Sequence, residues 1–209
     1  MQGNQTITLG MGCFWSPEAL FGSLPGVEET RVGYAGGTTG QPTYREMGEH
    51  SETVEIVYDA ELISIDRLLE TFWDHHNPVN INGYKGRQYQ SLLLYRDERQ
   101  AEAFNRMKKR MEAAKGYPLE TEIVPFKAFY AAEPRHQKYY LKRYPDAAGK
   151  LRGLYESEEA FLRSTLAARL NGVAKGYANL APVLREIQAW PIRPDERDAL
   201  IERVRQIRW

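Results

Sequence analysis

The feature that most constrains the fold of this chain is the alternation of short strand patterns with helical ones. Polar and apolar residues alternate over 6–11 and 54–58, as in strands, whose successive side chains point to opposite faces. Apolar residues recur at helical spacing over 65–76 and 97–115. Further strands are expected after Pro25–Gly26, over 91–95 and over 121–126, and a short helix over 136–144. Strands interleaved with helices predict an α+β fold, a two-layer α/β sandwich.

Two helices carry recognisable end signals. The run Ser16-Pro17-Glu18 predicts an N-cap, a proline at the first helical position and an acid in the first turn of a helix to about Leu24. The helix over 97–115 begins with acids and is followed by Gly116, a residue typical of helix C-termini. Cys13 therefore lies between a strand and the N-terminus of a helix.

After Pro145 the pattern becomes helical throughout. Helices are expected over 158–170, 179–190 and 194–208. We therefore predict a domain over residues 1–150 and a helical C-terminal extension over 151–209 that packs on it.

The charge balance argues against polyanionic partners. The chain has 28 Lys and Arg residues against 28 Asp and Glu, a formal net charge of +0, so no overall positive field would attract nucleic acid or an anionic membrane. No stretch is as long and apolar as a membrane span, and the polar start lacks a signal peptide. We expect no nucleic-acid or membrane partner and a cytoplasmic location.

Neither a metal nor an organic cofactor is expected. The single cysteine, Cys13, excludes an intrachain disulfide and a multi-cysteine zinc site. His75 and His76 point apart because they are adjacent, and they fit the basic end of a helix better than a metal site. The glycines between Gly33 and Gly40 match neither a dinucleotide fingerprint nor a phosphate-binding loop.

The surroundings of Cys13 favour a reactive thiol over a buried structural cysteine. Gly12 lets the backbone turn tightly before it, and the partial positive charge of the helix N-terminus after it favours the thiolate. Lowering the thiol pKa from ~8.5 to ~7 would make the thiolate abundant at neutral pH. Phe14 and Trp15 could wall a pocket for a small apolar group, or belong to the core.

The segment Gly12-Cys13-Phe14-Trp15 resembles the active-site signature of the A-type peptide methionine sulfoxide reductases (MsrA). Other matches follow in the order that this family shows, and the similarity covers residues 5–145. These matches are Gly33-Tyr34-Ala35-Gly36-Gly37, Pro42-Thr43-Tyr44, His50-Ser51-Glu52, Phe72-Trp73, His76-Asn77-Pro78, Gly86-Arg87-Gln88-Tyr89-Gln90-Ser91, Phe129-Tyr130-Ala131-Ala132-Glu133 and His136-Gln137.

The resemblance implies a ferredoxin-like two-layer core with Cys13 as the nucleophile. The residues that it places around the sulfoxide are Tyr44, Glu52 and Tyr89 at the oxygen, and Phe14 with Trp15 at the methyl group. Supporting positions around these residues are Gly12, His50, Gln88, Glu133 and His136.

The chemistry requires a proton donor opposite the thiolate, because a sulfoxide sulfur is a poor electrophile until its oxygen is protonated or strongly hydrogen-bonded. Glu52 fits this role only when protonated. As a carboxylate it would raise the pKa of Cys13 by like-charge repulsion, whereas burial would raise its own pKa, so the two titrations are expected to be coupled. The phenols of Tyr44 and Tyr89 can orient the oxygen, and release of methionine leaves Cys13 as a sulfenic acid.

The chain departs from the family in lacking a second cysteine. Most relatives carry resolving cysteines in a C-terminal coil, so we predict a one-cysteine enzyme whose sulfenic acid is reduced by an outside thiol. Thioredoxin, glutaredoxin or a small thiol would form a mixed disulfide, and the helical extension would act as a cap or a docking surface. The substrate would be methionine sulfoxide, in proteins or free, and the activity a repair of oxidative damage.

Smaller departures concern single positions. The loop over 78–86 is shorter than usual and has Tyr84 where the family commonly has an aspartate, so Asn80 and Asn82 are candidates for the missing hydrogen bond. Relatives have a glycine where Ser16 stands.

The residues leave two functions of other kinds open. Cys13 with His50 or His136 would suit an acyl transferase or hydrolase, provided that a histidine lies within hydrogen-bond reach of the thiol. The other is an inactive relative that binds methionine-containing segments.

Overall fold

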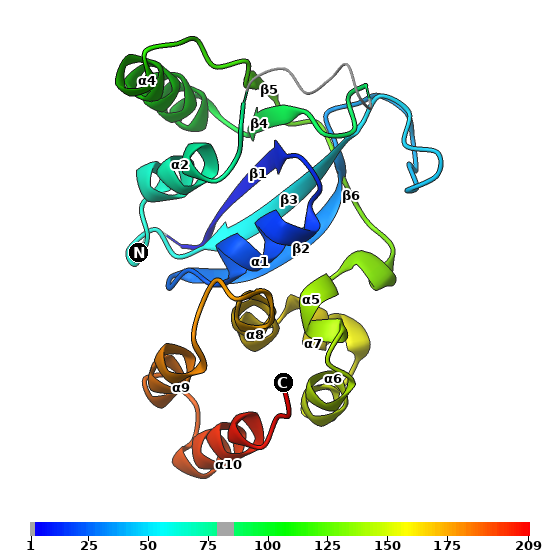
Figure 1. Cartoon of the computed structure of the whole chain (residues 1–209), viewed down its shortest axis with the longest axis vertical. Coiled ribbons are helices and arrows are strands. Elements are labelled where there is room, and N and C mark those ends of the chain that lie inside the picture. Colours follow the sequence, from blue (N-terminus) through cyan, green and yellow to red (C-terminus); the bar gives the residue numbers. More distant parts are fainter. Residues whose placement is uncertain (1–2, 79–85) are drawn as a thin grey trace.

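The computed structural model describes residues 3–78 and 86–209, and Figure 1 shows a central sheet with helices around it. The strands are β1 (Gln5–Met11), β2 (Val27–Ala35), β3 (Ser51–Tyr58), β4 (Ser91–Tyr95), β5 (Glu122–Pro125) and β6 (Phe129–Ala131). They form a six-stranded sheet in the order β5-β4-β1-β3-β2-β6. Neighbours are antiparallel except for β4 and β5, which are parallel. This arrangement confirms the predicted α+β class.

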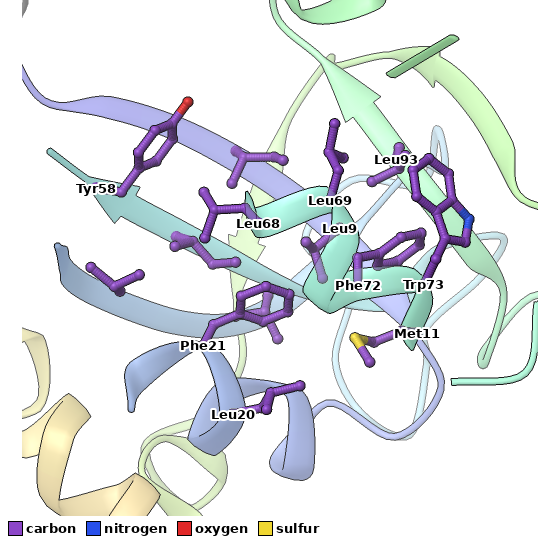
Figure 2. Packing of buried hydrophobic residues seen from close by; sticks show 14 of the residues in the cluster. Leu9, Met11, Leu20, Phe21, Tyr58, Leu68, Leu69, Phe72, Trp73 and Leu93 are labelled. Carbon is purple, nitrogen blue, oxygen red and sulfur yellow. The ribbon is translucent and has the colours of Figure 1, made fainter. Parts of the chain in front are cut away.

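The central strands and their helices form the core that the resemblance implied. Along the chain the elements are β1, α1 (Trp15–Gly22), β2, β3, α2 (Ile65–Asp74), β4 and α4 (Glu98–Lys115). Figure 2 shows Phe21 of α1 and Phe72 of α2 packed over the sheet beside Leu9 of β1, and all three side chains are fully buried. The helices therefore cover one face of the sheet, as in ferredoxin-like folds.

Local sequence signals explain why α2 and α4 were predictable. Asp97 Oδ1 accepts a hydrogen bond from the backbone N–H of Gln100 at 2.8 Å at the start of α4, and Gly116 ends that helix with a φ of 77°. Ser64 Oγ accepts one from the N–H of Arg67 at 3.2 Å at the start of α2.

The C-terminal helices form a second apolar cluster. They are α5 (Tyr139–Lys142), α6 (Pro145–Arg152), α7 (Glu158–Arg163), α8 (Thr165–Lys175), α9 (Leu180–Gln188) and α10 (Pro194–Arg205). Their cluster begins at Leu141, before the predicted boundary at residue 150, so that boundary stays a prediction.

Helix α8 joins this cluster to the core by packing against α1 (Figure 1). The approach is close because glycines face the contact: a Cβ on Gly22 would lie 2.7 Å from Ala168 O, and one on Gly172 would lie 2.6 Å from Ser23 Cβ. The buried Arg169 also donates a hydrogen bond to Gly22 O at 2.8 Å, while Glu186 of α9 accepts two from the same guanidinium. The C-terminal helices thus hold the end of α1.

Three predictions of local structure were wrong. Ser16 is not an N-cap: α1 begins at Trp15, and the Ser16 hydroxyl is hydrogen-bonded to the Tyr140 hydroxyl at 2.8 Å. The expected helix over 136–144 is a 3-10 turn and then α5, because Lys138 between them has a left-handed φ of 50°. The expected helix over 158–170 divides at Ser164, whose side chain caps α8.

Other differences concern elements that the sequence patterns did not indicate. Strand β6 pairs with the edge of β2, where a Cβ on Gly33 would collide with Tyr130 O. Helix α6 begins at Pro145, a position before the first of the expected C-terminal helices. His76 is not a basic helix end: burial lowers its pKa to about 4.

Tyr84, Asn80 and Asn82 lie outside the described residues. Within 3–78 and 86–209, no helix is long and apolar enough to cross a membrane.

Candidate active site

Cys13 occupies the short connection between β1 and α1 and is exposed. Gly12 before it has a φ of 89°, a left-handed conformation that favours glycine, and this turn directs the chain from the strand into the helix. The backbone N–H of Trp15, in the first turn of α1, donates a hydrogen bond toward the sulfur. The expected place of Cys13 at a helix N-terminus is therefore confirmed.

Glu52 lies next to Cys13 and is 1% exposed. It belongs to β3, and its carboxylate accepts a hydrogen bond from the backbone N–H of Phe14 at 3.0 Å. The side-chain amide of Gln88 donates a hydrogen bond to the other carboxylate oxygen at 2.8 Å. The backbone carbonyl of Gln88 accepts one from the backbone N–H of Glu52, also at 2.8 Å. A buried acid is thus fixed against the loop that carries the thiol.

The pKa of Cys13 is raised above its ordinary value, which contradicts the thiolate expected from the helix N-terminus alone. Although the residue is exposed, the protein around the sulfur removes part of its hydration, and this is the main cause. The charge of Glu52 and a hydrogen bond with it also raise the pKa. Among the described residues, the N–H of Trp15 is the one group that lowers it, so the free enzyme holds a thiol rather than a thiolate at neutral pH.

The phenols of Tyr44 and Tyr89 lie beside this pair. Partial burial raises the pKa of Tyr89 to about 12, and the nearby Glu52, Tyr44 and Cys13 add to the shift, as does a hydrogen bond with Tyr44. Tyr44 is 36% exposed, and its backbone N–H donates to a carboxylate oxygen of Glu133 at 3.3 Å. The structure therefore brings together the four residues predicted to act on the sulfoxide group.

An aromatic wall stands next to the thiol. Phe14 is buried and Trp15 partly buried, and the ring of His136 lies 5.5 Å from that of Phe14 and 4.9 Å from that of Tyr44. The indole N–H of Trp15 donates to His136 Nδ1 at 3.3 Å. The ring of Tyr139 stacks on the indole of Trp15, with the ring centroids 3.8 Å apart and the planes at 4°.

Glu133 is hydrogen-bonded to Tyr34 and Tyr44 beside the site. It accepts a hydrogen bond from the Tyr34 hydroxyl at 2.7 Å, so its pKa is lowered even though burial by itself raises it. Burial, and then the bond to Glu133, raise the pKa of Tyr34. We did not single out Tyr34 or Tyr139 from the sequence. Tyr34 lies directly opposite Glu52 in the β2–β3 register, a relation visible only once the strands are paired.

His50 shapes a loop and has no free ring nitrogen for catalysis. Its Nδ1 accepts the backbone N–H of Gly37 at 3.1 Å, and its Nε2 donates to Thr39 O at 2.7 Å. In the part of the chain that the structure describes, no three His, Cys, Asp or Glu side chains are grouped to hold a metal ion.

A family model described as peptide methionine sulfoxide reductase matches residues 5–167. A peptide methionine sulfoxide reductase of Drosophila melanogaster is 39% identical over 202 residues, which cover 96% of this chain and 80% of that protein. Peptide methionine sulfoxide reductase A5 of Oryza sativa subsp. japonica is 42% identical over 174 residues, 81% of this chain and 68% of the relative.

Two solved structures are also similar to this chain. Methionine sulfoxide reductase A of Corynebacterium diphtheriae has a TM-score of 0.59 and 35% identity, covering 70% of this chain and 77% of that chain. Mxr1 from Saccharomyces cerevisiae in reduced form has a TM-score of 0.61 and 27% identity, covering 68% and 86%. These relatives do not favour the acyl transferase or the inactive binding protein. The chain therefore belongs to the MsrA family of peptide methionine sulfoxide reductases, and its activity is the reduction of methionine sulfoxide.

Proposed function

We propose that Cys13 attacks the sulfoxide sulfur and that Glu52 carries the proton to the oxygen, with the S epimer as substrate. The contact between the exposed thiol and the buried carboxylate supports this proposal above all. Because the pKa of Cys13 is raised, the resting enzyme has its proton on sulfur. The neighbouring carboxylate can take that proton and pass it on.

The proton moves in the same step as the electrons. As Cys13 loses its proton to Glu52, the resulting thiolate attacks the sulfoxide sulfur, and Glu52 protonates the oxygen. The hydroxyl then passes from the sulfoxide sulfur to Cys13 Sγ, and the transient bond between the two sulfurs breaks. The sulfoxide sulfur is thereby reduced by two electrons and Cys13 is oxidised by two, so methionine leaves and the sulfenic acid of Cys13 remains. The site carries one negative charge throughout, which avoids the cost of placing two negative groups side by side.

The other site residues orient the substrate. We assign to the hydroxyls of Tyr44 and Tyr89 the binding of the sulfoxide oxygen, on the support of their position beside Cys13 and Glu52. Phe14 and Trp15 offer apolar surface to the methyl group, and Gln88 and Glu133 hold Glu52 and Tyr44 in place. His136 supports Trp15, while Gly12 and His50 shape the backbone.

The second half of the cycle needs an outside thiol, because this chain has no cysteine other than Cys13. A thiol displaces water from the sulfenic acid to give a mixed disulfide. A further thiol attacks this mixed disulfide, which frees the Cys13 thiol and leaves the reductant as a disulfide. Mxr1 of Saccharomyces cerevisiae has been solved in complex with Trx2. We propose a thioredoxin as the reductant, with glutaredoxin or a small thiol as rivals, and a cytoplasmic location.

The test incubates the reduced protein with each epimer of methionine sulfoxide and traps sulfenic acid for mass spectrometry. Oxidation of Cys13 by the S epimer alone is expected, and the Cys13→Ser variant is the control. Absence of a Cys13 adduct with both epimers would overturn the proposal, and retained substrate binding in that case would indicate an inactive relative. Turnover with thioredoxin, glutaredoxin and dithiothreitol then identifies the reductant.

A further inference from the structure

The indole of Trp15 is held on two sides by one segment that follows β6. Tyr139 covers one face, with ring centroids 3.8 Å apart and planes at 4°, and His136 accepts the indole N–H at 3.3 Å. Stacking and a hydrogen bond together leave the indole little freedom to rotate. Trp15 is therefore a fixed wall rather than a mobile side chain.

Buried charges fix the backbone from which Tyr139 projects. Lys138 and Glu18 of α1 are both fully buried, and Glu18 accepts the backbone N–H of Lys138 at 2.8 Å and its ammonium at 2.7 Å. The same ammonium donates to Thr30 O at 2.6 Å. These contacts hold Lys138 at its left-handed φ of 50°, immediately before Tyr139.

A second tie lies on the other side of Tyr139. The hydroxyl of Tyr140 is hydrogen-bonded to Ser16 Oγ of α1 at 2.8 Å, and Lys175 of α8 lies 4.8 Å above the Tyr140 ring. Tyr139 is thus anchored to α1 through both of its neighbours, and α1 is the helix that carries Trp15. The stacked pair is therefore tied to the helix that follows the Cys13 loop.

We propose that Tyr139 is a positioning residue that sets the size selectivity of the active site by holding Trp15 against the alkyl group of the sulfoxide. The proposal rests on the proposed role of Trp15 as the wall of the methyl site. A rigid wall excludes a larger alkyl group, whereas an indole that can swing away admits it. Discrimination of a single methylene in such a pocket is worth about 10- to 200-fold in kcat/KM.

The experiment measures kcat and KM for methionine sulfoxide and for ethionine sulfoxide, which differs by one methylene. In Tyr139→Leu the methyl-to-ethyl ratio of kcat/KM should fall about tenfold, since the stack is lost. Tyr139→Phe keeps the ring and should keep the ratio. If the role of Tyr139 were purely structural, Tyr139→Leu would lower kcat/KM for both substrates by the same factor. An unchanged methyl-to-ethyl ratio in Tyr139→Leu therefore overturns the proposal.

Two further variants keep the test decisive. Urea unfolding shows whether Tyr139→Leu is folded, and Tyr139→Met provides the same comparison if it is not. Trp15→Leu separates the two levels of the argument. If its ratio is unchanged, the proposed role of Trp15 fails; if it changes while the Tyr139→Leu ratio does not, only the inference about Tyr139 fails.

Discussion

The backbone N–H of Phe14 donates a hydrogen bond to the carboxylate of Glu52 at 3.0 Å, so the acid that raises the pKa of Cys13 also fixes the loop next to it. One side chain of β3 therefore contributes to both the geometry and the protonation state of the nucleophile, although loss of hydration is the main cause of the raised pKa. This double role is the basis of the first two predictions.

Replacing Glu52 by Gln should lower kcat/KM about 10²- to 10⁴-fold, because the amide cannot transfer a proton to the sulfoxide oxygen. The amide oxygen can still accept the N–H of Phe14, so the fold should persist. Steady-state turnover of methionine sulfoxide measures the effect. Glu61→Gln, an exposed site with the same change of charge, is the matched control. Activity close to that of the unmodified enzyme would remove Glu52 from the mechanism.

Alkylation of Cys13 by iodoacetamide should follow a pKa above that of an ordinary cysteine. A raised pKa means that the reactive thiolate is scarce at neutral pH and appears only as the pH rises through the shifted value. Rates across a pH series, for the native protein and for the protein unfolded in urea, provide the comparison. The midpoint should lie higher in the native protein and move down in Glu52→Gln. A native midpoint at or below the unfolded one would contradict the structure.

Gly12→Ala should lower both stability and activity. Its φ of 89° would place an alanine in the left-handed region at a cost of about 1–2 kcal/mol, although no atom lies within 4 Å of the new Cβ. Gly116→Ala is a matched control, since it has a φ of 77°, the same open space and a place at the end of α4. Urea unfolding should show similar losses, whereas turnover should fall only in Gly12→Ala. Equal activities would show that the turn does not position the thiol.

Gly172→Ala should destabilise the protein by about 1–3 kcal/mol, because the added methyl group would meet Ser23 and the backbone of Ala19 across the α1–α8 contact. Gly149→Ala in α6 faces open space and should be neutral or stabilising by about 0.5–1 kcal/mol. The free energy of unfolding in urea decides between them. No difference between the two variants would mean that α8 does not pack on α1 as described.

Elements with strong local signals were predictable from the sequence. Helix α4 has a capping acid, an apolar stripe and a C-terminal glycine, and α2 has a clear apolar face, so their places follow from residues close in the chain. Strand β6, the left-handed Lys138 and the break at Ser164 were not predictable. Each depends on contacts with distant segments, such as the buried pair of Lys138 with Glu18.

The candidate site was also predictable from the sequence only in part. The motifs and their resemblance to MsrA identified Cys13, Glu52 and the two tyrosines as the reacting set, and the structure places them side by side. The stack of Tyr139 on Trp15 left no signal in the sequence, because a tyrosine in a short helix has no feature that marks it as a partner of an indole far away in the chain.

The sequence by itself determined the order of the strands and helices from β1 to β5, the lone thiol at the start of a helix and the kinds of residue available to act on a sulfoxide. Only the tertiary structure decided the charge of that thiol and the rigidity of the wall beside it. The physical reason is that hydration and the field of a neighbouring carboxylate depend on distances in space. The pairing of β1 with β3 brings Glu52 to Cys13 and reverses the protonation state that the helix N-terminus alone would favour, whereas the contacts of α1 with the segment after β6 hold the aromatic wall.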